Sequence, residues 1–266
     1  MTKTQPYRGT QAVLRAIALL KVFSDARPQW GLSDLAQAVG LNKTTTYRLL
    51  TALESEELLE RHAETDTYRL GLGMVSLGGY ALRANDLRTL CQPELRSLAA
   101  SAKETAALEL LTGAEVLILD EVTGDRVMSG GQAIGTRWPA VATSTGKAML
   151  AALGEAEATA VLPPHWPSLT PHTLPDHAAL FADFAQTRAR GYAVADEELE
   201  IGLVAVGAPL LDFDGRVVAA ISLAGPKSRL GDGRVAEIGP LVAAAARRIS
   251  IHLGYAPDVR SEERRV

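Results

Sequence analysis

The strongest structural signal in this sequence lies in residues 32–53, where two runs of helically spaced apolar residues flank a glycine. Ser33 is a suitable N-cap, and the apolar residues after it predict a short first helix over residues 34–39. Gly40 can take the positive φ that ends a helix, and Asn42 then begins a second helix. The pattern therefore predicts two helices joined by a tight turn, which is a helix–turn–helix.

The second helix of this pair has a polar outward face, because its apolar residues and Thr46 share the opposite side. Hydroxyl and guanidinium groups read base edges in the major groove of DNA, and lysine and arginine contact phosphates. A helix, a glycine turn and a second helix also occur in all-α proteins that do not bind DNA. The candidate DNA-binding residues on this helix are Lys43, Thr44, Thr45, Tyr47, Arg48 and Thr51.

Charge is distributed unevenly along the chain. Residues 1–51 hold seven basic and two acidic residues, whereas the 266-residue chain has 27 Lys and Arg against 31 Asp and Glu, a net charge of −4. The positive N-terminal region is therefore a local feature. It favours double-stranded DNA as the partner of this region.

Two further elements are expected around the helix–turn–helix. A helix from Thr10 to about Phe23 is expected to lie beneath it, after a polar arm over residues 1–9. The helical spacing predicts a buried stripe on this first helix that consists of Val13, Leu14, Ile17 and Leu20.

The second element is a hairpin, predicted by two short β runs at residues 58–62 and 67–71 with a polar connection between them. A hairpin at this place is the wing of a winged helix–turn–helix. Arg61 and Arg69 are then candidate contacts to the phosphate backbone, and a surface hairpin with ordinary charges is the alternative.

The region after the wing predicts a linker. Residues 73–90 indicate one helix with exposed apolar surface, because four leucines accompany two central glycines, and such helices often pair. Pro93 fits the first turn of the following helix. The expected organisation is a winged helix–turn–helix domain over residues 1–72, a linker helix over 73–90, a second domain over 91–256 and a flexible tail over 257–266.

The second domain is predicted to be α+β, because antiparallel β runs alternate with helical segments. Residues 105–111 and 115–122 predict a hairpin, and residues 126–130 form a third β run. Five prolines between residues 162 and 175 predict a loop. Further helices are expected over residues 144–153, 176–190 and 233–253, and further strands over 192–196, 203–211 and 216–224.

Composition sets limits on the class of protein. With 47% hydrophobic and 22% charged residues the chain is an ordinary globular one, and its longest apolar run is too short for a membrane span. We expect a cytoplasmic protein. Cys91 is the only cysteine, which excludes an intrachain disulfide and a thiolate metal cluster and leaves packing as its expected role. No cofactor is expected.

The order of motifs resembles the IclR (isocitrate lyase regulator) family of bacterial transcription factors over nearly the whole chain. The N-terminal motifs are Leu32-Ser33-Asp34-Leu35-Ala36, Gly40-Leu41, Lys43-Thr44, Arg48-Leu49-Leu50, Leu53 and Tyr68-Arg69-Leu70-Gly71. The C-terminal motifs are Thr143, Gly146-Lys147-Ala148, Gly191-Tyr192-Ala193, Asp196-Glu197-Glu198, Gly202-Leu203, Ala208-Pro209, Asp212, Ala219-Ala220-Ile221-Ser222 and Gly225-Pro226.

This resemblance implies a homodimer or homotetramer that binds operator DNA. It also implies that the C-terminal domain is GAF-like and binds a small organic acid effector that changes operator binding. It implies a regulator, a repressor among the possibilities, rather than an enzyme.

The effector pocket is expected to differ from the family pattern. Ala195, Ala205 and Ala224 stand where the family often has polar or sulfur-containing residues, and Trp138 stands where it often has an aliphatic one. This change predicts a larger, drier pocket that suits a flat or aromatic acid. The carboxylate is expected to meet the N–H groups at the start of the helix after position 143. The candidate effector-binding residues are Val127, Gly130, Trp138, Ser144, Thr145, Ala195, Ala205, Ser222 and Ala224.

Three other kinds of site share some of these residue types. A P-loop needs a glycine at position 141, where this chain has valine. His165, His172 and His177 lack regular metal-ligand spacing, and the three acids at 196–198 have no accompanying nucleophile and base. The competing class of function is a small-molecule sensor or enzyme that uses its helix–turn–helix for protein contacts. Salt-dependent retention on DNA or heparin discriminates the two classes.

Overall fold

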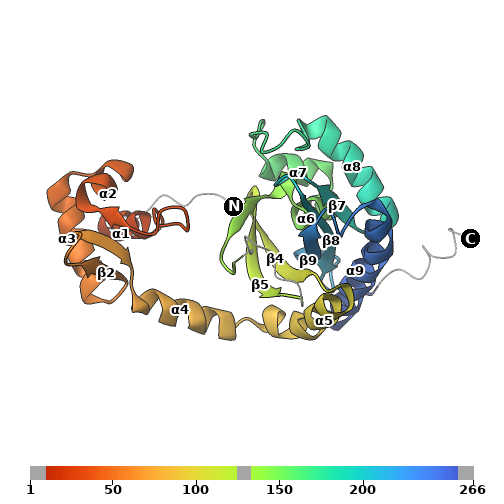
Figure 1. The fold of residues 1–266 in the computed structure, drawn as a ribbon, viewed down its shortest axis with the longest axis horizontal. Coiled ribbons are helices and arrows are strands. Elements are labelled where there is room, and N and C mark those ends of the chain that lie inside the picture. Colours follow the sequence, from red (N-terminus) through yellow and green to blue (C-terminus); the bar gives the residue numbers. More distant parts are fainter. Residues whose placement is uncertain (1–9, 125–132, 257–266) are drawn as a thin grey trace, which may run out of the picture. The chain divides into compact units, whose positions relative to one another are not determined.

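The computed structural model describes residues 10–124 and 133–256, and the chain divides into two compact units between Asn85 and Asp86 (Figure 1). Each unit has its own hydrophobic core. Val127 and Gly130, two of the candidate effector residues, and the β run expected over 126–130 lie outside the described residues.

In its described residues the first unit has four helices and a small antiparallel sheet in the order β1-β3-β2. The predicted hairpin is confirmed, since β2 and β3 pair antiparallel with Leu59 opposite Leu70. The two-residue strand β1 was not predicted. The elements are α1 (Gln11–Leu20), β1 (Trp30–Gly31), α2 (Leu32–Ala38), α3 (Lys43–Ser55), β2 (Leu59–His62), β3 (Thr67–Leu70) and α4 (Leu72–Arg83).

The helix–turn–helix is formed by α2 and α3. Gly40, with φ +67°, makes the turn, and the Asn42 side chain caps α3 by accepting a hydrogen bond from the Thr45 N–H at 2.8 Å. The N-cap predicted for the first helix was wrong. Gly31, rather than Ser33, occupies that position, because the chain leaves β1 at Gly31 and enters the helix at once.

The buried stripe predicted for α1 was also wrong. Val13 is 60% exposed, and Leu14 and Ile17 are exposed as well, whereas Leu19 is buried. Of the four predicted residues only Leu20 packs against the core, because the helix contacts the core of its unit through its C-terminal end, so the other three stay uncovered by the described residues of this unit. Helical periodicity shows which residues share a face but does not show what covers that face.

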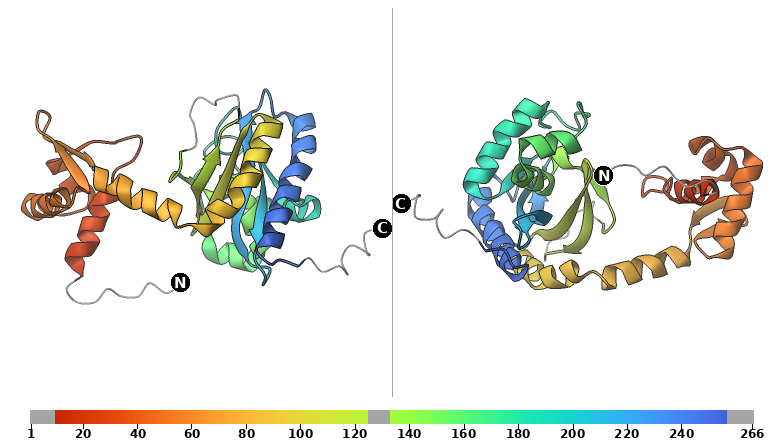
Figure 2. Two further views of the ribbon diagram at one scale, coloured as in Figure 1. Left: turned by 90° about the horizontal axis from the view of Figure 1, so that it is seen from below. Right: turned by 180° about the vertical axis from the view of Figure 1, so that it is seen from behind.

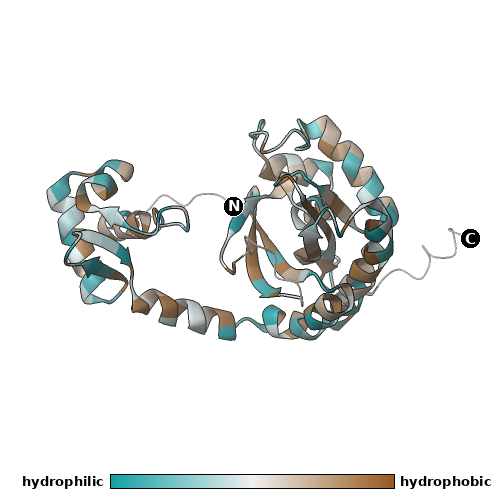
Figure 3. Ribbon diagram, viewed as in Figure 1, coloured by the Kyte–Doolittle hydropathy of each residue, from teal (hydrophilic) through white to brown (hydrophobic). Residues whose placement is uncertain are grey.

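The linker differs from the single helix predicted over residues 73–90. The structure has α4 up to Arg83, a break at residues 84–85, and then α5 (Asp86–Ala102), which belongs to the second unit. Pro93 lies inside α5 rather than in its first turn. The predicted exposure of apolar surface is confirmed for α4, which buries no residue and shows hydrophobic positions along its length (Figure 3).

The second unit is built on a six-stranded antiparallel sheet in the order β6-β5-β4-β9-β8-β7. This arrangement confirms the α+β class and the predicted hairpin of β4 and β5. Strand β6 and helix α7 were not predicted. The remaining elements are β4 (Thr105–Thr112), β5 (Glu115–Val122), β6 (Arg137–Pro139), a 3₁₀ turn (Ala140–Ala142), α6 (Ser144–Leu153), α7 (Glu155–Val161), α8 (His177–Arg190), β7 (Ala193–Asp196), β8 (Leu203–Leu211), β9 (Val217–Pro226) and α9 (Asp232–His252).

Helices cover both faces of this sheet. Helices α5 and α9 lie side by side on one face, and α6 packs on the other with α7 and α8 outside it (Figure 2). The central strands β4, β9 and β8 are therefore buried on both sides, and a core of small and branched apolar residues separates the layers. In the described part of the chain no helix is both long and apolar enough to span a bilayer.

Candidate functional site

The outward face of α3 carries the candidate DNA-binding residues. Thr46, Leu50 and Leu53 are buried against the unit's core, as the sequence predicted. Lys43, Thr44, Tyr47, Arg48 and Thr51 are exposed and Thr45 is partly exposed, so these side chains line one accessible surface. This surface holds two basic groups, four hydroxyls and no acid, a composition that suits contacts with base edges and phosphates in the major groove.

The two arginines of the wing are already paired with acids. Arg69 makes bonds of 2.9 to 3.1 Å to Glu60 across the hairpin, and Arg61 contacts Asp66 at 2.5 to 2.7 Å. The hydrogen bond from Arg69 is the largest cause that lowers the pKa of Glu60. Because these pairs are exposed, water and phosphate can compete for the guanidinium groups. Sequence reasoning placed both arginines on the wing but did not anticipate their partners.

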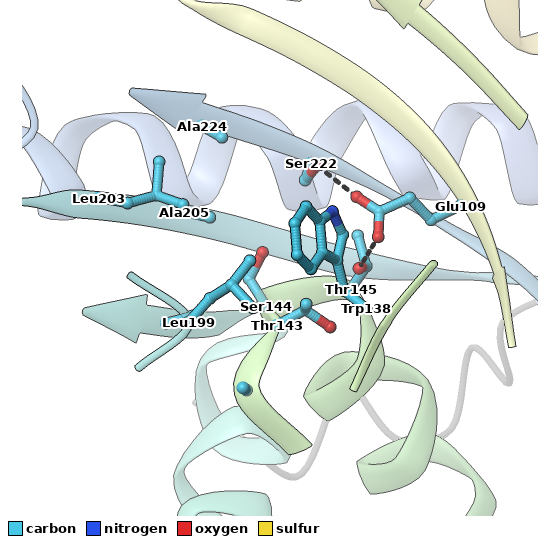
Figure 4. A pocket seen from close by; sticks show the side chains of 12 residues that line it. Glu109, Trp138, Thr143, Ser144, Thr145, Leu199, Leu203, Ala205, Ser222 and Ala224 are labelled. Atoms are coloured by element: carbon cyan, nitrogen blue, oxygen red, sulfur yellow. Dashed lines mark hydrogen bonds between the residues drawn. The ribbon is translucent and has the colours of Figure 1, made fainter. Parts of the chain in front are cut away.

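A cavity lies between the large sheet and the start of α6 (Figure 4). Seven of the candidate effector residues line it, namely Trp138, Ser144, Thr145, Ala195, Ala205, Ser222 and Ala224. Five lining residues were missed by sequence reasoning: Glu109, Ala142, Thr143, Leu199 and Leu203.

Strand register explains why the three alanines belong to one site. Ala205 of β8 is opposite Ala195 of β7 and opposite Ala224 of β9, so the three form a row across three strands. Their small side chains make a flat apolar floor. Ser222, two residues before Ala224, points to the same face because side chains alternate along a strand.

The polar end of this cavity is a buried carboxyl group. Glu109 is 4% exposed, and one of its oxygens accepts a hydrogen bond from the Thr145 hydroxyl at 2.6 Å. The Ser222 hydroxyl donates to the other oxygen at a longer 3.4 Å. Burial, with a smaller contribution from the nearby Glu121, raises the pKa of Glu109 to about 7 against the opposing effect of these two donors. The Ser222 hydroxyl is thus directed at a carboxyl of the protein.

Trp138 projects from β6 into the middle of the cavity (Figure 4). The space that remains has a volume of about 20 Å³, which is room for about one water molecule. The expectation of a larger and drier cavity is therefore not met, because the indole fills the space beside the alanines and Glu109 adds a polar group. A ring-sized ligand requires the Trp138 side chain to move.

The start of α6 is held tightly against the sheet. The Thr143 hydroxyl caps the helix by accepting from the Gly146 N–H at 3.1 Å. The helix therefore begins where the sequence predicted, and the carboxylate site at its N-terminus stays a prediction. A Cβ atom at position 207 of β8 would lie 2.8 Å from the Thr145 nitrogen, so only glycine allows this approach. The first N–H groups of the helix have no acceptor within it.

Other residues singled out in the sequence have structural roles. The Cys91 thiol is buried, which raises its pKa to about 12 and makes it unreactive. Lys147 is buried and bonds Glu198 at 2.6 Å, so these residues belong to an internal ion pair. Among the described residues, no cluster of His, Cys, Asp and Glu has the arrangement of a metal site.

The first unit has an exposed recognition helix beside a wing, and the second unit encloses a cavity. This combination is typical of a DNA-binding transcriptional regulator. Two family descriptions match the chain, "Bacterial transcriptional regulator IclR C-terminal" over residues 79–251 and "IclR helix-turn-helix domain" over residues 12–63. The chain belongs to the IclR family of bacterial transcriptional regulators.

Individual relatives agree with this assignment. The chain is 34% identical over 260 residues to the transcriptional repressor IclR of Escherichia coli, covering 94% of this chain and 93% of that protein. It is 33% identical over 246 residues to the regulator XynR of the same organism, covering 92% and 98%. A solved IclR homologue of Microbacterium hydrocarbonoxydans, in complex with 4-hydroxybenzoate, matches with a TM-score of 0.76 and 26% identity, covering 91% and 98%. These relatives are regulators of transcription rather than enzymes.

Proposed function

We propose that this chain binds double-stranded operator DNA through the outward face of α3, and that a small organic acid in the C-terminal cavity changes that binding. The proposal rests on the presence of two sites in one chain. The exposed face of α3 has basic and hydroxyl groups without an acid, and the second unit has a cavity with an aromatic wall.

The roles within the DNA-binding surface follow from side-chain chemistry. Arg48 and the hydroxyls of Thr44, Thr45 and Thr51 suit base edges, and Lys43 suits a phosphate. Arg61 and Arg69 of the wing suit flanking phosphates, where each exchanges an exposed carboxylate for a phosphate oxygen.

An aromatic acid is the effector that we propose for the cavity. Trp138 supplies a ring for stacking, and the three-alanine floor leaves a flat surface opposite. The N–H groups of Ser144 and Thr145 at the start of α6 suit a carboxylate. The 4-hydroxybenzoate complex of the Microbacterium homologue supports an aromatic acid as a ligand class for this fold.

Calorimetry with aromatic and short aliphatic acids tests this assignment. We expect a substituted benzoate to bind more tightly than glyoxylate or pyruvate, because a ring buries more apolar area. Trp138→Ala and Ser222→Ala are expected to weaken the best ligand, and the ligand is expected to change operator affinity in a mobility-shift titration. The assignment fails if only the two-carbon and three-carbon acids bind, or if neither substitution alters affinity.

We also propose a homodimer or homotetramer on a pseudo-palindromic operator. On α4, Leu72 is 74% exposed and Val75 is 70% exposed, and α1 adds the uncovered Val13 and Ile17. Apolar surface of this kind is covered when subunits associate. The two α3 recognition helices of a dimer then bind two half-sites that lie one or more turns of the DNA helix apart.

Light scattering of the free chain and of its DNA complex measures this association. We expect Val75→Asp to weaken the dimer, because it places a charge in the apolar surface of α4. Ala81→Asp, at an exposed position on the side of α4 away from Leu72 and Val75, is the matched control and is expected to leave association unchanged. A parent chain that stays monomeric both free and on DNA contradicts the proposal.

A further inference from the structure

The cavity of the second unit contains a carboxyl group whose charge has no counterpart there. None of the twelve described residues that line the cavity is basic, and Glu109 is the one acid among them. Thr145 and Ser222 each donate one hydrogen bond to it, whereas two carboxylate oxygens offer about four acceptor positions. Each oxygen therefore keeps acceptor capacity, and Oε1 is the less satisfied of the two because its bond from Ser222 is long, at 3.4 Å.

This carboxyl restricts what a ligand can place beside it. A second carboxylate in contact with Glu109 is repelled when Glu109 is ionised, and the described lining offers no cation to offset the repulsion. A methyl group leaves the remaining acceptor positions buried and unused. A hydrogen-bond donor satisfies them. The carboxylate of an acid ligand therefore belongs at the Ser144 side of the cavity and a donor at the Glu109 side.

Trp138 narrows the choice of donor. Its Nε1 atom is buried and has no hydrogen-bond partner among the described residues. In Figure 4 the indole nitrogen is turned toward the side of the cavity on which Ser222 and Glu109 lie. An ammonium group donates but cannot accept from this N–H, whereas a hydroxyl group does both.

We propose that the effector carries a hydroxyl group on its ring, which donates to Glu109 and, once the indole has moved to admit the ring, accepts from Trp138 Nε1. This assignment rests on the proposed function, since it names the ligand class of the same cavity. Glu109 is then a specificity-determining residue. It selects hydroxylated rings and rejects acids of the same size that lack the hydroxyl.

Calorimetry with three probes of equal ring size tests the proposal: 4-hydroxybenzoate, 4-methylbenzoate and 4-methylphenol. At pH 8 most of the Glu109 carboxyl is ionised, because its pKa is about 7. The parent chain is expected to bind 4-hydroxybenzoate about 10- to 100-fold more tightly than 4-methylbenzoate, since the two differ only in the hydroxyl. Glu109→Gln is expected to reduce this preference about tenfold and to improve the binding of 4-methylbenzoate.

Two further variants serve as comparisons. Glu121→Gln removes a neighbouring carboxyl that does not line the cavity, so it is expected to keep the parent's preference. Trp138→Phe keeps a ring and removes the N–H, so it is expected to weaken 4-hydroxybenzoate more than 4-methylbenzoate. A general loss of folding lowers the affinity for both benzoates together and leaves their ratio unchanged.

The outcomes separate this inference from the proposed function. Equal binding of the two benzoates by the parent overturns the role of Glu109 and leaves acid sensing intact. If 4-methylphenol binds and neither benzoate does, the hydroxyl contact is supported and the assignment of an acid as the effector is overturned. If none of the three probes binds at millimolar concentration, the ligand class is wrong, while operator binding through α3 is judged separately by mobility shift.

Discussion

Arg48→Ala is expected to abolish specific operator binding at the concentrations where the parent binds. Arg48 is exposed in the second turn of α3, on the face opposite the buried Thr46 and Leu50. Loss of one base or phosphate contact costs about 1–3 kcal/mol per half-site. The proposed dimer on two half-sites therefore loses about 2–6 kcal/mol, or on the order of 30- to 20,000-fold in affinity.

The measurement is a mobility-shift or anisotropy titration with operator DNA, together with a thermal melt. The melting temperature is expected to be unchanged, because removal of an exposed side chain without a buried partner costs little stability. Arg15→Ala on α1 is the matched control, since it removes the same charge from an exposed position outside α3. An Arg48→Ala chain that is folded and binds as tightly as the parent shows that α3 does not read the operator.

The helix–turn–helix and its wing could be predicted because their signals are local. A glycine turn at position 40, a capping Asn42 and apolar residues at helical spacing lie within about twenty residues of one another. The errors arose where an outcome depends on distant partners. Strand β1 exists because Trp30 pairs with Tyr68 of β3, and the stripe of α1 stays exposed because its own unit does not cover it.

The cavity was predicted only in part, because some of its residues are brought together by contacts between distant parts of the chain. Motif resemblance located Trp138, Ser222 and the alanines, but it gave no account of Glu109. The contact of Glu109 with Ser222 joins residues 113 positions apart, through the pairing of β4 with β9. One signal was available in the sequence. Glu109 interrupts the otherwise apolar run of residues 106–111, and a charge at such a position is buried only with partners.

A second buried charge, Lys147, connects the cavity to the stability of its unit. Its side chain is 1% exposed, and its Nζ lies 2.6 Å from Glu198 Oε1 and 3.5 Å from Asp183 Oδ2. Burial raises the pKa of Glu198, and the Lys147 charge opposes that rise. Glu198 precedes Leu199, which lines the cavity, so this ion pair fixes the cavity wall to α6.

Lys147→Met is therefore expected to destabilise the second unit strongly. The substitution leaves Glu198 buried without a cation, and breaking a buried pair in this way costs about 3–5 kcal/mol. For a unit of this size the loss corresponds to a fall of roughly 6–20 °C in melting temperature. Calorimetry of the full chain measures it as a shift of the second unit's transition, while the first unit's transition stays in place.

Two comparisons decide whether the unpaired Glu198 carboxylate causes the lower melting temperature of Lys147→Met. The double variant Lys147→Met, Glu198→Gln is expected to recover much of the loss, because it removes the uncompensated charge as well. Lys227→Met is the matched surface control, since Lys227 pairs with Asp196 and Glu197 of the same acidic run but is 41% exposed, and it is expected to shift the transition little. If Lys147→Met melts like the parent, or if the double variant is no better than the single one, the Lys147–Glu198 contact does not hold this wall of the cavity.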